Sequence, residues 1–360
     1  MMKRSMLAAA LAILAGGAAN AQSSVTMFGL VDVGYAHLSG RNNGSLSILG
    51  PDGYQSSRLG FRGVEDLGGG LRASFWLEAA LTPDDGQGGA TNSNNQPSGA
   101  GAATAGRQGL TFNRRSTVSI AGSWGEVRLG RDYVPGFWNL SAFNPFGTNG
   151  VGSSGHLFYP VQGAARVTNV RASNSFGYIL PGNLNGFYGQ AMYALGENAS
   201  NAGATEDDGD VLGFRLGWAS GKFDAAFGVT RTEIAALGDL RQTNFGASYD
   251  FGMAKPMVLI NENRTGATRT RTWLIGATVP AFGIGMFRAA YSRVNTSAVA
   301  NDADQWALGY VHNLSKRTAV YANWSRVSNK AGGTNYHNGR ATTAPGGSST
   351  GYELGLRHTF

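Results

Sequence analysis

The chain has 360 residues, a formal charge of +7 and no cysteine, so disulfides cannot stabilise it. Only 14% of its residues are charged, 42% are hydrophobic and 55 are glycine, which is unusual for a soluble protein of this length and suits a closed β-sheet. Of the 29 basic residues 24 are arginine, whose planar guanidinium favours small organic or inorganic anions as partners.

The N-terminus is typical of a secretory signal peptide. Two basic residues, an apolar run and a small-residue exit follow one another at Lys3 and Arg4, Met6–Ala15 and Ala19-Asn20-Ala21. A run of about ten apolar residues is too short to cross ~30 Å of hydrocarbon as a helix. We therefore expect residues 1–21 to be removed before Gln22, leaving one exported domain over 22–360 that does not meet nucleic acid.

Segments of about ten residues with alternating polar and apolar side chains repeat from Val25 to Phe360, as in transmembrane β-barrels. In the segment 58–62, Leu59 and Phe61 share one parity and the two arginines the other, so one face would meet lipid and the other water. In the segment 72–78 Glu78 has the polar parity, and Trp76 shares it and weakens the pattern.

These segments predict an all-β fold, an antiparallel barrel of sixteen strands with both ends of the chain on one side. The strands are expected near residues 24–38, 55–66, 70–82, 109–122, 126–133, 166–181, 185–196, 210–221, 222–233, 241–252, 255–265, 270–281, 283–295, 303–314, 317–328 and 350–360. Short turns are expected at 250–253, 279–283 and 313–317.

Three long loops are expected at the other end of the barrel. Residues 83–108 and 329–349 are rich in Gly and small polar residues and are typical of surface loops. The loop 134–165 differs, because its large apolar side chains are costly to leave in water. They are Phe137, Trp138, Phe143, Phe146, Leu157, Phe158 and Tyr159. We expect this loop to fold onto or into the barrel.

Several segments, in one order along the chain, resemble the general diffusion porins of Gram-negative bacteria, in particular the betaproteobacterial type. They are SSVTMFG at 23–29, SRLGFRGVEDLGGGL at 57–71, FNRR at 112–115, GEVRLGR at 125–131, RASNSFGY at 171–178, LSKRT at 314–318 and GLRHTF at 355–360. The resemblance implies a homotrimer of sixteen-stranded barrels whose third external loop, 134–165, folds into the lumen and narrows it. It also implies that Phe360 is an outer-membrane assembly signal, although the alternation alone would make it lipid-facing.

The resemblance also suggests which residues line the narrow part of the pore. By motif position Arg58, Arg114 and Arg171 resemble the family's constriction arginines, and Glu78 the acid that tethers one of them. Parity supports Arg58 and Glu78. It leaves open whether Arg114 or Arg115 faces the lumen, because Val118 and Ile120 share the parity of Arg114 and a bulge would be needed to turn it inward.

Charge predicts which ions such a pore would favour. No Asp or Glu occurs from Val134 to Gly196, so the inward loop lacks acids that would oppose the arginines. The basic lining is expected to continue through Arg62, Arg72, Arg128, Arg131 and Arg166. Several of these could instead neutralise wall carboxylates such as Glu65, Asp66, Glu126 and Asp132, and that alternative stays open.

The sequence therefore predicts a passive outer-membrane channel for small hydrophilic solutes, anion-preferring, in contact with lipid and lipopolysaccharide, without catalysis, cofactor or metal. The histidines at 37, 156, 312, 337 and 358 have no metal-site spacing. The acids at 84–85 and 206–208 could bind divalent cations or bridge lipopolysaccharide, but solvated loops also explain them. The rival functions are a barrel hydrolase that uses Ser, His and an acid, and a barrel-mounted adhesin or receptor.

Overall fold

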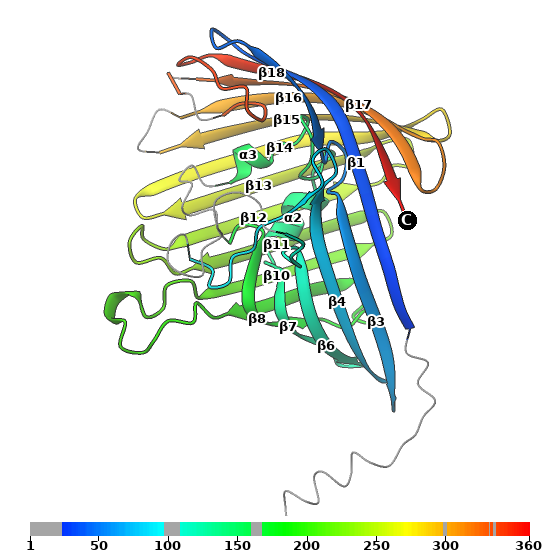
Figure 1. Ribbon diagram of the computed structural model, residues 1–360, viewed down its shortest axis with the longest axis vertical. Coiled ribbons are helices and arrows are strands. Elements are labelled where there is room, and N and C mark those ends of the chain that lie inside the picture. Colours follow the sequence, from blue (N-terminus) through cyan, green and yellow to red (C-terminus); the bar gives the residue numbers. More distant parts are fainter. Residues whose placement is uncertain (1–23, 97–108, 160–167, 298–300, 331, 334–335) are drawn as a thin grey trace, which may run out of the picture.

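Long strands make up most of the structure, a computed structural model that describes residues 24–96, 109–159, 168–297, 301–330, 332–333 and 336–360 (Figure 1). Sixteen of the eighteen strands form the wall: β1 (Ser24–Gly40), β3 (Arg58–Gly68), β4 (Leu71–Thr82), β6 (Arg115–Gly122), β7 (Gly125–Tyr133), β8 (Arg171–Ile179), β9 (Phe187–Ala194), β10 (Val211–Ser220), β11 (Phe223–Thr232), β12 (Leu240–Tyr249), β13 (Lys255–Thr265), β14 (Thr268–Ala281), β15 (Gly285–Thr296), β16 (Ala303–Asn313), β17 (Thr318–Asn329) and β18 (Ser348–Thr359). The predicted signal peptide, residues 1–21, lies outside the described residues.

The wall closes because its first and last strands pair. β1 and β18 are antiparallel from Leu30 opposite Thr359 to Gly40 opposite Ser349. Beyond them Gly29 and Phe360 exchange two backbone hydrogen bonds of 3.1 Å. The Phe360 ring lies directly over Gly29, where an added Cβ would approach it to 2.2 Å. The predicted closed antiparallel barrel is confirmed.

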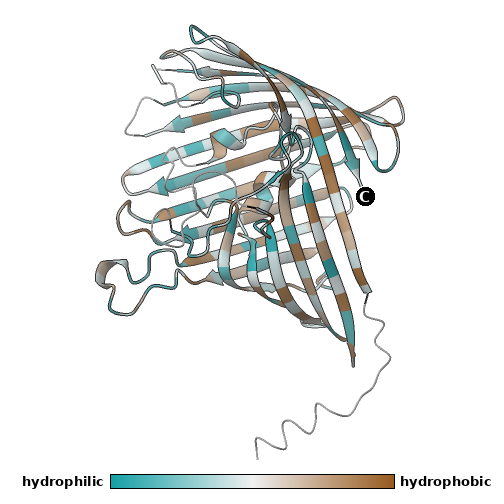
Figure 2. Ribbon diagram, viewed as in Figure 1, coloured by the Kyte–Doolittle hydropathy of each residue, from teal (hydrophilic) through white to brown (hydrophobic). Residues whose placement is uncertain are grey.

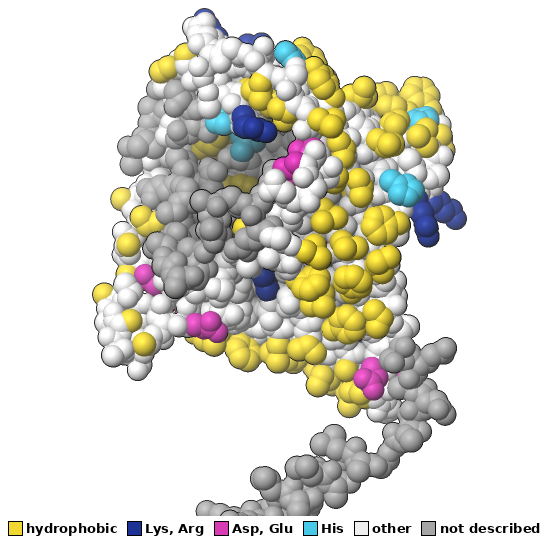
Figure 3. Space-filling model, in the orientation of Figure 1, with side chains coloured by type: hydrophobic (Ala, Val, Ile, Leu, Met, Phe, Trp, Pro, Cys, Tyr) yellow, Lys and Arg dark blue, Asp and Glu magenta, His cyan; other side chains and the backbone are white. Residues whose placement is uncertain are grey.

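Side-chain alternation separates the two faces of the wall, as Figure 2 shows by its alternating colours along the strands. In β12, Gln242 and Asn244 point inward and are 2% exposed, whereas Phe245 points outward and is 43% exposed. Figure 3 shows hydrophobic side chains gathered over the outer face of the wall around β1, β3 and β4. In the described residues no helix is long and apolar enough to cross a membrane.

The expected short turns are present, with one shift. The chain turns between β12 and β13 at 250–254 and between β16 and β17 at 314–317. Between β14 and β15 the turn is shorter than predicted, because β14 runs on to Ala281 and leaves 282–284 as the turn. These turns lie at the end of the barrel where β1 begins and β18 ends.

The first hairpin departs from the prediction. Residues expected to be loop form β2 (Ser45–Pro51), which pairs with the second half of β1, and β3 begins at Arg58 instead of residue 55. Between them 52–57 leaves the ladder. The Asp32 carboxylate holds it by accepting from the backbone N–H of Tyr54 at 2.9 Å and of Gln55 at 2.6 Å. Contacts from Asp32 to residues more than twenty positions away have no signature in local alternation.

Two other strand starts were predicted too early. The strand expected from residue 109 begins at Arg115, and the one expected from 166 begins at Arg171. A minimal two-residue strand, β5 (Gln87–Gly88), pairs with the end of β4 inside the region predicted as loop. Side-chain contacts of Asn113 with Ala80 and Ala90 replace the regular ladder before β6.

The loop that begins at residue 134, called the inner loop below, packs against inward-facing residues of β11–β16. It contains the helices α2 (Phe137–Ala142) and α3 (Gly155–Phe158), which lie within the ring of strands in Figure 1. Its buried side chains and small or aliphatic wall residues form one cluster: Leu140, Phe143, Phe146 and Phe158 with Ala226, Leu259, Leu274, Ala290 and Ala307. Phe143 lies over Gly246, where any side chain would collide with its ring. Burial of the aromatic rings explains why this loop lies on the wall and not in water.

Polar wall residues hold the same loop through its backbone. Asn263 donates to the Phe158 carbonyl at 2.7 Å, and Thr272 donates to the Leu157 carbonyl at 2.7 Å. Asn244 donates to the Gly136 carbonyl at 2.9 Å. These inward polar residues of β12–β14 are therefore bound to the loop. Because the loop lies on that side of the barrel, the space along β3–β8 stays open.

Candidate functional site

A cavity of about 750 Å³ lies inside the barrel, between the wall strands β3, β4, β6 and β8 and the inner segments 52–56 and 137–159. Its charged lining residues are Arg58, Arg114, Arg115, Arg171, Asp52 and Glu78. The structure thus brings together all five residues that the sequence placed at the constriction, from four different strands and the residue just before β6.

Glu78 of β4 is the centre of the cluster. Its carboxylate accepts from Arg114 Nε at 2.6 Å and from Trp76 Nε1 at 3.1 Å, and Arg58 Nη1 lies 3.9 Å away. The Glu78 side chain is 7% exposed and that of Arg58 29%. A buried carboxylate that binds one arginine closely leaves the more exposed one free to face the cavity.

Tyr133, at the end of β7, joins Arg114 to Arg171. Its hydroxyl accepts from Arg114 Nη2 at 2.8 Å and from Arg171 Nη2 at 2.7 Å. The Arg171 guanidinium also lies over the Tyr133 ring, 4.3 Å from its centroid. Sequence reasoning missed Tyr133, because a tyrosine at a strand end is common and nothing local indicates that it will lie between two cations.

Both Arg114 and Arg115 face the cavity. Arg115 begins β6 and shares the inward parity of Thr117 and Ser119. Arg114 precedes the strand, and its backbone N–H bonds to the Glu78 carbonyl while its side chain turns inward to the Glu78 carboxylate. The alternation could not decide between them because Arg114 lies before the first regular strand residue.

Trp76 supports the arginines from the lumen side of β4. Its ring lies 4.7 Å from the Arg115 guanidinium and 5.3 Å from that of Arg62, and Phe28 lies beside it at 4.9 Å. Such cation–π contacts stabilise a charge without neutralising it. The position of Trp76 on the polar parity, which weakened the strand pattern, is therefore an inward position in the structure.

The side of the cavity opposite the arginines carries no acid. It is formed by Trp138, Ser141, Thr148, Asn149 and Tyr159. Asp52 and Glu78 are the carboxylates among the described residues that line the cavity, against four arginines. Because arginine stays protonated at any ordinary pH, the excess of positive charge is permanent.

The segment 52–57 was also missed. It brings Asp52, Gln55 and Ser56 to the cavity, and Ser56 donates to Asn149 of the inner loop at 2.8 Å. Gln55 accepts from Arg357 Nη1 at 3.0 Å. The cavity is therefore bounded by the segment 52–57 and the inner loop, which contact each other, and not by the inner loop alone.

The residues predicted as further basic lining fall into different settings. Arg62 is exposed and stacks on Phe28 and Trp76, and Arg72 is exposed and stands opposite Asp66. Arg128 forms ion pairs with Glu126 at 2.9 Å and Asp132 at 2.6 Å, as the alternative interpretation anticipates.

Arg131 is not among the residues that line the cavity. It donates instead to the Asn113 and Asn92 carbonyls and to Ser173. Arg166 lies outside the described residues. Among the described residues, Arg62 and Arg72 thus remain candidates for an extended lining.

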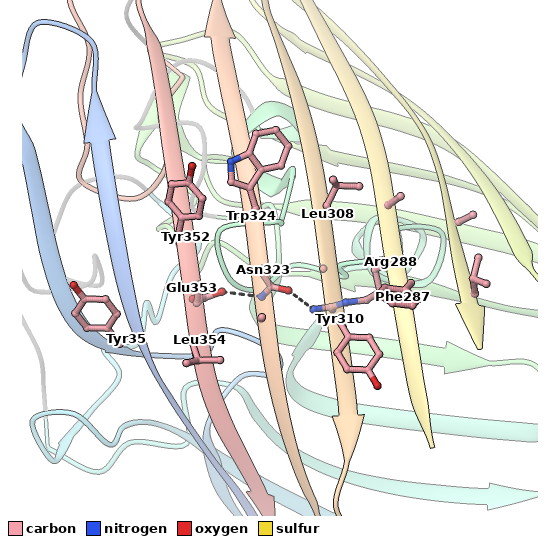
Figure 4. A pocket seen from close by; sticks show the side chains of 15 residues that line it. Tyr35, Phe287, Arg288, Leu308, Tyr310, Asn323, Trp324, Tyr352, Glu353 and Leu354 are labelled. Carbon is pink, nitrogen blue, oxygen red and sulfur yellow. Dashed lines mark hydrogen bonds between the residues drawn. The ribbon is translucent and has the colours of Figure 1, made fainter. Parts of the chain in front are cut away.

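Inward polar side chains of β15, β17 and β18 bond to one another across the wall. Asn323 accepts from Arg288 Nη2 at 2.7 Å and donates to the Glu353 carboxylate at 2.9 Å (Figure 4). Glu353 also accepts from the Val151 backbone N–H of the inner loop. A second hollow, of about 710 Å³, opens mainly between outward side chains such as Trp324 and Tyr352, so it belongs to the apolar face.

Comparison with known proteins agrees with this architecture. The family model of the Gram-negative porins matches residues 8–332 of this chain. The chain is a Gram-negative porin. It is 36% identical to outer membrane porin protein 32 of Delftia acidovorans, with all of both proteins covered, and 26% identical to an outer membrane porin protein of Bordetella pertussis.

Solved structures carry the comparison to the fold. An anion-selective porin from Comamonas acidovorans is 35% identical and superposes with a TM-score of 0.80, over 94% of this porin and 100% of that chain. OmpT of Vibrio cholerae, at 14% identity, a TM-score of 0.63 and 94% coverage, shares the fold alone. The predicted family and outer-membrane location of this porin are confirmed.

Proposed function

We propose that this porin is a passive diffusion channel for small hydrophilic solutes that favours anions, and that Arg58, Arg114, Arg115 and Arg171 set this preference. The observation that carries the proposal is the charge of the cavity: four arginines and two carboxylates face it, opposite a segment without acids. The similarity to an anion-selective porin supports it.

The preference would arise from fixed charge and not from a binding step. A unit charge at ~4 Å contributes ~4 kcal/mol at an effective dielectric constant near 20, so a few uncompensated arginines attract anions and repel cations. Hydrogen bonds to Glu78 and Tyr133 keep Arg114 and Arg171 from turning away. Because neither side chain has to be reoriented when an ion arrives, passage of the ion requires little free energy of side-chain rearrangement.

Arg62 would extend this route along β3. Arg58 and Arg62 are four residues apart on one strand, which corresponds to about 13 Å at ~3.3 Å per residue. Both have the parity that faces the lumen. Arg62 is paired with Trp76, and Arg58 is paired with Ala80, two residues after the inward Glu78. An anion that leaves Arg58 would therefore meet a second cation before it reaches the end with short turns.

Several further properties belong to the same proposal. They are cleavage before Gln22, assembly as a homotrimer, contact with lipopolysaccharide, a role of Phe360 in assembly, and the absence of catalysis. A gel run without denaturant tests the trimer, and migration as a monomer alone would count against it.

Planar-bilayer recording tests the channel itself. Purified protein under a salt gradient should give stepwise conductance and a reversal potential of the sign expected for anions. Insertion without current, or a reversal potential of the opposite sign, would refute the proposal. Hydrolysis of esters or peptides that is lost on changing a single Ser or His would favour the hydrolase instead.

A further inference from the structure

Four arginines lie directly opposite one another on neighbouring strands of the barrel. Arg231 stands opposite Arg241, Arg241 opposite Arg264, and Arg264 opposite Arg269, across β11, β12, β13 and β14. Side chains paired in this way have Cβ atoms about 4.5–5.5 Å apart, and like charges at such positions are destabilising. This arginine row therefore calls for a source of negative charge.

The arginine row points away from the lumen. In β12 and β13 the residues of the other parity, Asn244 and Asn263, donate to carbonyls of the inner loop and so face inward. The side chains of Arg231 and Arg264 are 52% and 55% exposed. The row lies at the end of the barrel opposite the short turns, next to the loop 233–239 and the turn at 266–267.

Carboxylates of the chain satisfy the row only in part. Arg231 pairs with Asp239 at 2.6 Å and with Glu233 at 3.4 Å. One carboxylate, Glu262, is shared by Arg264, Arg269 and the neighbouring Arg271. Within the part of the chain that the structure describes, no carboxylate lies within 4.0 Å of the Arg241 guanidinium.

A recess of about 370 Å³ lies beside Arg241 on this face. Arg241, Arg264 and Glu262 bound it at the level of the row, and Phe227, Phe245 and Ile260 line it further along the strands. These three apolar side chains are 43%, 43% and 58% exposed. A guanidinium pair above an apolar groove fits an amphiphile with an anionic head and an acyl chain.

The two rims of the outer face differ in chemistry. Towards the short turns the outward side chains are aromatic, with Trp218 against Phe223 and Tyr249 against Phe251, as at an ordinary membrane interface. Towards the long loops the corresponding level carries the arginine row. Arginine binds phosphate oxygens through two parallel hydrogen bonds, so the phosphate group of a lipid is an anion that this row fits.

We propose that the arginine row binds the phosphate groups of a phosphorylated glycolipid of the outer leaflet, with an acyl chain lying on Phe227, Phe245 and Ile260. Arg241 is its centre because it stands between two other arginines, and no carboxylate of the described residues lies within 4.0 Å of its guanidinium. The site locates the lipid contact included in the proposed function, and it does not depend on the ion preference of the pore.

Lipid titration of the intact barrel in detergent tests the site. Wild-type protein should bind bis-phosphorylated lipid A at least about tenfold more tightly than the same lipid without phosphates, measured by native mass spectrometry. The double variant Arg241→Gln/Arg264→Gln should lose that difference and keep its affinity for the dephosphorylated lipid. Arg62→Gln, which removes a charge from the lumen, is the matched control and should bind like wild type.

Three outcomes would overturn the site. The first is equal affinity of wild type for both lipids, and the second is binding of inorganic phosphate alone as tight as that of the phosphorylated lipid. The third is a change of oligomeric state in the double variant, which would make this face a subunit contact.

If that variant fails to fold, Arg241→Lys/Arg264→Lys is the second variant to test. It keeps the charge and loses the planar fork, and should retain less than half of the phosphate discrimination. Reversal potentials of the two variants of the arginine row should match that of wild type, so failure of this site is distinguishable from failure of the channel.

Discussion

Arginine is used in two different ways in this porin, inside the barrel and on its outer face. The lumen arginines come from the starts of β3, β6 and β8 and converge on one cavity, where Glu78 and Tyr133 hold Arg114 and Arg171. The arginine row comes from four adjacent strands in register and shares its few carboxylates unevenly. The comparison teaches that the function of a basic residue here follows from its face and its partners, and not from charge alone.

The largest difference between the two sets is expected from reversing one charge in each. Arg58→Glu should lower the ratio of anion to cation permeability about tenfold, equivalent to ~1.4 kcal/mol, because water screens part of the Coulomb interaction. Arg241→Glu should leave that ratio unchanged. Reversal potentials in planar bilayers measure both, and an unchanged ratio in the Arg58 variant would remove Arg58 from the selective region.

Removing the shared acid of the inner set should have the next largest effect. Glu78→Gln keeps the shape but deletes the negative charge next to Arg114 and Arg58, so the anion preference should rise about threefold, equivalent to ~0.65 kcal/mol. The buried Arg114 loses its ion pair, so the protein should also unfold at a lower temperature. A preference that falls although the barrel is folded would contradict this prediction and would show that Glu78 matters more for positioning the arginines than for its negative charge.

A smaller effect is expected from the hydroxyl that joins two lumen arginines. Tyr133→Phe keeps the ring under Arg171 but removes the acceptor for Arg114 and Arg171. Less well positioned guanidinium groups should lower the anion preference about twofold, equivalent to ~0.4 kcal/mol. Tyr188→Phe is a matched control, because Tyr188 lies outside the cavity, and a loss of equal size there would point to a general effect on the barrel.

The smallest effect is expected at an arginine that belongs to neither set. Arg131 binds the carbonyls of Asn92 and Asn113, so Arg131→Gln should leave the ion ratio unchanged within the error of the recording. It should instead make the segment around Asn92 easier to cleave by added protease. A shift of the reversal potential as large as that of Arg58→Glu would restore Arg131 to the pore lining.

Much of this architecture could be predicted because side-chain parity is a local property. The number of wall strands, their approximate positions and the inward direction of Arg58 and Glu78 follow from a period of two residues. The inward direction of Arg115 has the same origin. The resemblance to the porin family added Arg114 and Arg171, which parity alone did not place.

Other parts of the site depend on contacts between distant residues. Asp32 holds the segment 52–57 inside the barrel, and Tyr133 lies between two arginines from elsewhere in the chain. Neither arrangement leaves a pattern in the local sequence. The same holds for Arg114, whose inward turn is fixed by Glu78, 36 positions earlier.

By itself the sequence determined that this chain forms a closed sheet with an apolar and a basic face, because alternation along a strand acts between immediate neighbours. The tertiary structure decided which arginines converge, since register between strands and the path of inserted segments depend on pairings far apart in the chain. The arginine row is the clearest case: each of its members is an ordinary exposed residue in sequence, and only the pairing of four strands places them side by side.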